Sequence, residues 1–248
     1  MQIHEYDALE KVEREHWFYK GKRVLVRHWI ERAVTLASGD RIVDAGAGTG
    51  ELVRELKGAY EHHGVSVIGI EYSEEARRLA LERKGTNLLA GSILNLPLND
   101  DTSKVTIALD VLEHVEDDKL AFSELMRITA IGGLLIINVP AFMSLWSDWD
   151  VSLGHYRRYS KRMMSEVLAP FKTGFDTLYF DYANSFAFLP ILTVRKLSKI
   201  LRMQSRAEDR IPSPRMNKLL LDLFVAPSER TWYHPPFGSS LFCVLRKK

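Results

Sequence analysis

Several patterns that mark common protein classes are missing from this sequence. One cysteine among 248 residues excludes a disulfide within the chain. That cysteine, Cys243, stands in the apolar segment Leu241 to Leu245, which indicates a core residue rather than a nucleophile. The longest apolar run, Phe186 to Val194, is about half of the ~20 residues that a membrane-spanning helix needs. A net charge of +2 argues against the concentrated basic face of a nucleic-acid-binding protein.

The start of the chain, Met1 to Tyr6, is polar and lacks the apolar centre of a signal peptide. We therefore expect a cytoplasmic protein. A hydrophobic content of 46% supports a substantial core and argues against disorder. The length suits one large α/β domain with an insertion.

Short apolar segments alternate with amphipathic helical patterns along most of the chain. Continuous apolar strands that alternate with such helices indicate a parallel sheet covered on both faces. The sequence thus predicts an α/β fold with seven strands, preceded by a long helical pattern from Asp7 to Leu36. The expected strands are 41–44, 65–71, 87–90, 105–110, 134–139, 175–180 and 239–245.

The chain divides into segments of different character within one expected domain, 1–248. Two helical patterns around a polar, proline-containing loop form an insertion between the sixth and seventh strands that is too long for a turn. We expect it to be a helical cap. The segments are an N-terminal helical part (1–38), a ligand-binding core (39–140), an aromatic, irregular acceptor-side part (141–180), the cap (181–237) and the last strand (238–248).

The glycine-rich stretch after the first expected strand is the most informative motif. It follows Asp44 and has the pattern Gly-x-Gly-x-Gly over Gly46 to Gly50, with Glu51 next. Dinucleotide sites have Gly-x-Gly-x-x-Gly, which would need a glycine in place of Glu51. Glycines let a ligand approach the backbone closely. Carboxylates on both sides of the loop would repel a pyrophosphate and suit a ligand with ammonium and hydroxyl groups.

Four features fall at the carboxyl ends of successive expected strands. They are the Asp44 loop, Glu71, the segment Gly91 to Ile93, and the segment Asp110 to His114. In a doubly wound sheet, ligands bind outside these strand ends, where the strand order reverses. All four in order predict a nucleoside-type site.

From Gly39 to Pro140 the sequence resembles class I S-adenosylmethionine-dependent methyltransferases. The flanking segments Glu15 to Phe18 and Gly154 to Tyr159 resemble those of a broad group of bacterial small-molecule methyltransferases. The resemblance implies a Rossmann-like, doubly wound sheet, S-adenosyl-L-methionine as cofactor and a small-molecule acceptor.

The resemblance also implies residue roles in cofactor binding. The loop and Asp44 would hold the methionine end, Glu71 the ribose hydroxyls, and Ser92 with Ile93 the adenine edge. The family commonly has an aspartate where Ser92 stands, so the contact to adenine would be neutral and weaker. The implied cofactor-binding residues are Asp44, Gly46, Ala47, Gly48, Gly50, Glu71, Tyr72, Ser92, Ile93, Asp110 and Val111.

His155 and His114 are the candidate general bases, since histidine titrates near neutral pH. His155 follows the fifth strand, where acceptor-facing residues are expected. The alternative is a structural turn in which the arginines at 157 and 158 pair with Asp148 or Asp150. No His/Cys cluster has metal-ligand spacing, so we expect no metal.

The acceptor is left open by the sequence. We expect methyl transfer to oxygen or nitrogen of a small or medium-sized molecule. An RNA or protein methyltransferase, a nucleotide-dependent oxidoreductase and a non-catalytic nucleoside-binding module are the alternatives. The segment 186–202 fits a cap helix over the acceptor pocket better than a basic helix on a membrane surface.

Overall fold

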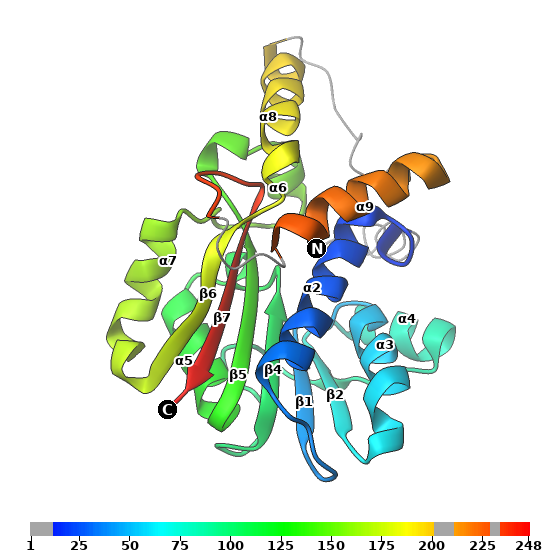
Figure 1. The fold of residues 1–248 in the computed structure, drawn as a ribbon, viewed down its shortest axis with the longest axis vertical. Helices are drawn as coiled ribbons and strands as arrows, with labels where there is room; N and C mark the ends of the chain where they lie inside the picture. Colours follow the sequence, from blue (N-terminus) through cyan, green and yellow to red (C-terminus); the bar gives the residue numbers. More distant parts are fainter. Residues whose placement is uncertain (1–11, 201–210, 229–233) are drawn as a thin grey trace.

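Seven strands form one sheet in the order β3-β2-β1-β4-β5-β7-β6 in the computed structural model, which describes residues 12–200, 211–228 and 234–248. The first five strands pair in parallel, and β7 runs antiparallel to β5 and β6 (Figure 1). The seven-stranded α/β prediction is confirmed. The strands are β1 Arg41–Ala45, β2 Ser66–Glu71, β3 Leu89–Ala90, β4 Ser103–Leu109, β5 Thr129–Pro140, β6 Phe175–Ala183 and β7 Ser240–Lys247.

Helices cover both faces of this sheet. Helices α5 and α7 contribute to one hydrophobic cluster, and α2, α3 and α9 contribute to the other. The α-helices are α2 Trp17–Ala33, α3 Glu51–Tyr60, α4 Glu74–Lys84, α5 Asp118–Ile128, α6 Asp148–Ser152, α7 Lys161–Leu168, α8 Ser185–Ile200 and α9 Pro214–Ser228. Short 3-10 helices are η1 Glu61–His63, η2 Leu112–His114, η3 Met143–Leu145 and η4 Ala169–Gly174.

The continuous apolar strands have the two-sided burial that their composition predicts. In β5, Leu134 and Ile136 belong to one cluster, whereas Leu135 and Ile137 belong to the other. Successive side chains of a strand point to opposite faces, so each residue needs an apolar partner layer. The central strands are therefore covered by helices on both sides.

The N-terminal helical prediction is wrong in its boundaries. A turn precedes Trp17, where α2 begins, and the helix ends at Ala33 instead of Leu36, while residues 7–11 lie outside the described part. The side chain of Asn217 on α9 accepts a hydrogen bond from the Trp17 N–H at 2.9 Å and donates one to the Glu15 carbonyl at 2.8 Å. These contacts come from a distant segment, so helical periodicity alone gave no sign of the break.

Two helices occupy the segment between β6 and β7 where the insertion was expected. Helix α9 packs against α2, and its buried Phe224 lies where a side chain at Gly21 would otherwise stand. Helix α8 projects beyond the sheet near α6 (Figure 1). Most of the expected polar loop, 204–214, lies outside the described residues. Among the helices that the structure describes, none has the length and apolar character of a membrane-spanning segment.

Candidate cofactor and acceptor site

A cavity of about 1380 Å³ opens where β1, β2, β4 and β5 end. Its walls also include the start of α2, residues 145–149, 153–155 and 158, and one side of α8. The sheet order reverses between β1 and β4, which is where a doubly wound sheet forms its ligand crevice. The predicted site residues that line it are Asp44, Gly46, Ala47, Gly48, Glu71, Tyr72, Ser92, Ile93, Asp110, Val111, His114 and His155.

The three glycines of the loop have different roles. All have positive φ, at +88° for Gly46, +54° for Gly48 and +79° for Gly50. Only at Gly48 would an added Cβ meet open space, so this backbone can be approached by a ligand. At Gly46 a Cβ would overlap the Val111 side chain. Gly50 is the N-cap of α3, and a Cβ there would meet Ala80 at 3.3 Å. Gly50 does not line the cavity, so its predicted cofactor contact is not supported.

Two acids from neighbouring strands lie at the cavity wall. Asp44 is only 3% exposed, and burial, reinforced by Glu13 and Glu71, raises its pKa to about 8. The Glu71 carboxylate accepts hydrogen bonds from the Gly48 N–H at 2.8 Å and the Ser73 N–H at 2.7 Å. Burial raises the pKa of Glu71, and these hydrogen bonds partly oppose that shift. A cationic or hydroxyl-bearing ligand would relieve the cost of burying both groups.

The segment after β3 forms a tight turn beside these acids. The Ser92 hydroxyl accepts a hydrogen bond from the Leu94 N–H at 3.2 Å, and Ile93 is buried. Tyr72, which follows Glu71, is 80% exposed and contributes to the rim of the cavity. Ser92, Ile93 and Tyr72 thus give this part of the cavity wall both polar and apolar surface.

Asp110 joins the floor of the cavity to the N-terminal helix. Its carboxylate accepts a hydrogen bond from Lys22 and another from the Asn138 side-chain amide at 2.6 Å. Lys22 is buried and lies 4.1 Å above the centroid of the Phe18 ring. Sequence reasoning missed Lys22, although it falls on the same helical stripe as the core residues Leu25 and Trp29. A lysine on an apolar stripe was the available signal.

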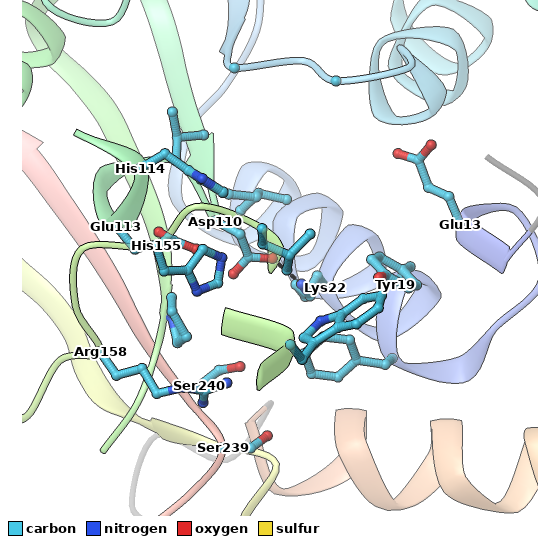
Figure 2. Close-up of a pocket in the computed structure, with 18 of the residues that line it drawn as sticks. Glu13, Tyr19, Lys22, Asp110, Glu113, His114, His155, Arg158, Ser239 and Ser240 are labelled. Atoms are coloured by element: carbon cyan, nitrogen blue, oxygen red, sulfur yellow. Dashed lines mark hydrogen bonds and ion pairs between the residues drawn. The ribbon is translucent and has the colours of Figure 1, made fainter. Parts of the chain in front are cut away.

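The other half of the cavity brings two distant segments together. The Tyr156 N–H donates to the Glu113 carbonyl at 2.7 Å, which holds residues 154–159 against η2. The His114 and His155 rings thereby meet edge to face, with centroids 4.6 Å apart (Figure 2). Burial lowers the pKa of His114 to about 4, and the charge of His155 contributes a smaller effect in the same direction. Both candidate bases therefore face the same space.

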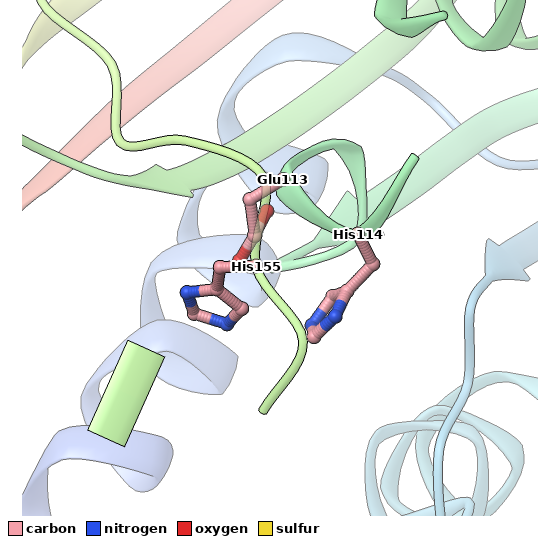
Figure 3. Close-up of side chains that lie close together, drawn as sticks. All are labelled: Glu113, His114 and His155. Carbon is pink, nitrogen blue, oxygen red and sulfur yellow. The ribbon is translucent and has the colours of Figure 1, made fainter. Parts of the chain in front are cut away.

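Glu113 is fully buried beside these histidines, and sequence reasoning placed no functional role on it. Neither of its carboxylate oxygens has a hydrogen-bond partner within the described part of the chain. Burial raises the pKa of Glu113 well above its usual range, and the charge of the nearby Asp110 adds a smaller effect in the same direction. Figure 3 shows the three side chains gathered at one point, where their ligating atoms lie within 4.8 Å of one another. Sequence spacing gave no sign of this cluster.

His155 is held by a buried ionic network. Its Nδ1 lies 3.0 Å from a carboxylate oxygen of Asp150, to which the Arg158 guanidinium also donates at 2.6 Å. Burial alone would raise the pKa of Asp150, but the His155 hydrogen bond and the Arg158 charge lower it to about 2. Arg157 pairs with Asp118 instead, at 2.8 Å. The segment is therefore an ordered turn and also presents His155 to the cavity.

The chain also matches known proteins over this part of the structure. Residues 43–137 match the methyltransferase domain family. Over these residues the chain carries a methyltransferase domain, and solved S-adenosylmethionine-dependent methyltransferases share its fold. This confirms the family resemblance, with its enzyme class and cofactor class, at the level of that domain.

Individual relatives support the methyltransferase domain over parts of their length. A demethylmenaquinone methyltransferase of Thermobifida fusca is 35% identical over 121 residues, which cover 45% of this chain and 49% of that protein. The chain spans about half the length of the first curated relatives that it matches.

Solved structures share the fold of the methyltransferase domain. A Thermotoga maritima protein described as a possible histamine N-methyltransferase has a TM-score of 0.58 at 20% identity, covering 99% of this chain and 96% of that chain. Phosphoethanolamine N-methyltransferase 2 of Haemonchus contortus, in complex with S-adenosyl-L-methionine, has a TM-score of 0.63 at 17% identity, covering 99% and 57%.

Proposed function

We propose that this chain is an S-adenosylmethionine-dependent methyltransferase that acts on an oxygen or nitrogen atom of a small or medium-sized acceptor. The observation that carries the proposal is one continuous cavity with two chemically different halves. One half has the glycine loop, Asp44 and Glu71, and the other has His114 and His155. The cofactor would supply a methyl group already activated on a sulfonium, so the protein needs chiefly to align and desolvate the reactants.

The described residues fit this cofactor in the first half of the cavity. The open backbone at Gly48 leaves room for the methionine part, and Asp44 would pair with its ammonium group. Glu71 would accept from both ribose hydroxyls, since each carboxylate oxygen has a second lone pair beyond its backbone hydrogen bond. Ser92 and Ile93 would contact the adenine edge, with Tyr72 at the rim.

The second half would hold the acceptor. Trp146 and Trp149 line it, and α8 adds Ile191 and Val194, which makes the cavity partly enclosed and favours a small acceptor over an RNA or a protein. Within this proposal, 141–180 is the acceptor-side segment and 181–237 is the cap. His155, oriented by Asp150, would be the general base, and His114 is the second candidate. The cytoplasmic location expected from the sequence belongs to the same proposal.

Direct titration of the cofactor tests the first half of the proposal. The full chain should bind S-adenosylmethionine and S-adenosylhomocysteine, with a rise in thermal stability, because a ligand that binds only the native state stabilises it. Glu71→Ala should weaken binding by at least tenfold, whereas NAD should not bind. Ser123→Ala, a change at a half-buried position on α5 that does not line the cavity, is the control. Binding of NAD in place of the methyl donor would overturn the proposal.

A general base at His155 is tested by turnover. With a panel of phenol, alcohol and amine acceptors, His155→Ala should lower kcat while leaving cofactor affinity within a factor of two. Full turnover by this variant on an accepted substrate would remove His155 from the mechanism.

A further inference from the structure

We propose that Glu113, His114 and His155 bind one divalent transition-metal ion at the acceptor end of the cavity. The residues come from two segments, η2 and the turn after α6, and meet only in the folded protein (Figure 3). The binding of the ion does not depend on methyl transfer. Its role toward the acceptor rests on the proposed function.

Glu113 is the first observation that points to a ligand. A buried carboxylate normally has hydrogen-bond partners, because a buried polar group without a partner is costly and a charged one more so. Glu113 has 0% exposure, and both of its oxygens lack such a partner among the described residues. A metal ion bound to these oxygens would satisfy them.

His155 is prepared as a metal ligand by its neighbour. Its Nδ1 faces the Asp150 carboxylate at 3.0 Å, and Asp150 is itself fixed by Arg158. Metal-binding histidines almost always place one ring nitrogen against a carboxylate or carbonyl, which orients the ring and makes the other nitrogen more basic. The Asp150 contact thus leaves Nε2 of His155 as the free ligand atom.

Two imidazoles and one carboxylate define the class of ion. Imidazole nitrogen favours zinc, cobalt, iron or nickel over magnesium and calcium, which prefer oxygen ligands. Metal–ligand distances are about 2.0–2.2 Å, so a separation of up to 4.8 Å between ligand atoms requires the side chains to draw together slightly on binding. With three protein ligands, the ion would keep open positions toward the cavity that His114 and His155 line.

An open metal position suggests a substrate class. With the ion bound, His114 and His155 would act as ligands, and the ion would replace them as the means of activating the acceptor. An acceptor hydroxyl bound to the ion would become more acidic and release its proton to solvent water, because coordination stabilises the oxygen anion. The cluster therefore favours an oxygen acceptor over an amine. Asp110, Lys22 and Arg158 are the other charged groups near Glu113.

Metal titration of the full chain tests the site. After treatment with a chelator, calorimetry with Zn²⁺, and Co²⁺ monitored by its visible absorption bands, should give one ion per chain. Glu113→Gln and His155→Gln should each weaken binding by at least tenfold. Asp150→Asn, which touches no metal, should weaken it by about 10–100-fold through the orientation of His155. Retained binding of S-adenosylhomocysteine checks that each variant is folded, and any unfolded variant is replaced by His114→Gln.

The exposed histidine pair on η1 provides the control. His62 and His63 have ring centroids 3.9 Å apart and form a ready surface site for adventitious metal. The double change His62→Gln/His63→Gln should leave the one-ion binding unchanged. Loss of binding in that control, equal binding by the folded Glu113 and His155 variants, or no binding of Zn²⁺ or Co²⁺ by the native chain would each overturn the proposal. Metal binding without methyl transfer would refute the proposed function and leave the metal site intact.

Discussion

We expect Asp44 to make the affinity for the cofactor depend on pH. Because the pKa of Asp44 is about 8, most Asp44 carboxyls are protonated at pH 6 to 7 and cannot pair with an ammonium group. If the ligand binds only when Asp44 is ionised, its affinity should fall about tenfold for each pH unit below the pKa of Asp44. This amounts to about 25-fold between pH 7.5 and pH 6. Each tenfold step corresponds to about 1.4 kcal/mol. The α-amino group of the ligand titrates near pH 8 and stays mostly charged over this range.

Calorimetry with S-adenosylhomocysteine measures this effect in two ways. The dissociation constant should rise about tenfold for each pH unit below the pKa of Asp44. Binding heats measured in buffers of different ionisation enthalpy should show release of about one proton per ligand at pH 6.5. Asp44→Asn should bind S-adenosylhomocysteine weakly, with an affinity that does not change with pH. Glu71→Gln should shift the fall in affinity to a lower pH range, because Glu71 raises the pKa of Asp44. An affinity of the native chain that does not change with pH would refute the reasoning, and so would the native pH dependence in Asp44→Asn.

The same group should affect the stability of the protein in the absence of added ligand. The folded pKa of Asp44 lies above the ordinary value of 3.8, so the native state holds a proton that the unfolded chain releases. Its contribution to stability is present below about pH 4 and is lost as the pH rises toward 8. Urea denaturation should show that Asp44→Asn lacks this decline, and an unchanged pH dependence in the variant would contradict the shift.

Two further predictions concern the loop and the floor of the cavity. Gly48→Ala should weaken cofactor binding while lowering stability by only about 1–2 kcal/mol, the usual strain of a left-handed residue. Gly46→Ala should destabilise further, because its Cβ also overlaps Val111; equal urea midpoints for the two variants would contradict this difference. Lys22→Met should cost about 1–3 kcal/mol in urea denaturation, since it removes a charged partner from Asp110. The double variant Lys22→Met/Asp110→Asn should recover part of that loss, and purely additive losses would argue against the pairing.

Local patterns predicted most of the residues that line the half of the cavity proposed for the cofactor. Ser73 is of a residue type that favours the start of a helix, and its hydroxyl accepts a hydrogen bond from the Ala76 N–H at 3.3 Å at the beginning of α4. Asp44, Glu71 and Asp110 were placed together because parallel strands end at the same edge of a sheet. This inference needs only strand positions and their direction, which apolar runs and turn residues specify.

Predictions failed where a distant segment decided the outcome. Gly50 looked like part of the ligand loop, but it does not line the cavity, and a Cβ at this position would meet Ala80 on α4. The break before Trp17 depends on Asn217, which is 200 residues away in the chain. Contacts of this kind follow from how the helices pack and leave no periodic signal in either segment.

The sequence by itself determined the order of strands and helices and the set of polar residues at the strand ends, because both follow from short-range spacing and the parallel sheet. Only the tertiary structure decided that Lys22 would pair with Asp110, and that Glu113 and His114 would meet His155. The physical reason is that buried polar groups find partners wherever the packing of the core brings segments together. That packing depends on the whole chain at once.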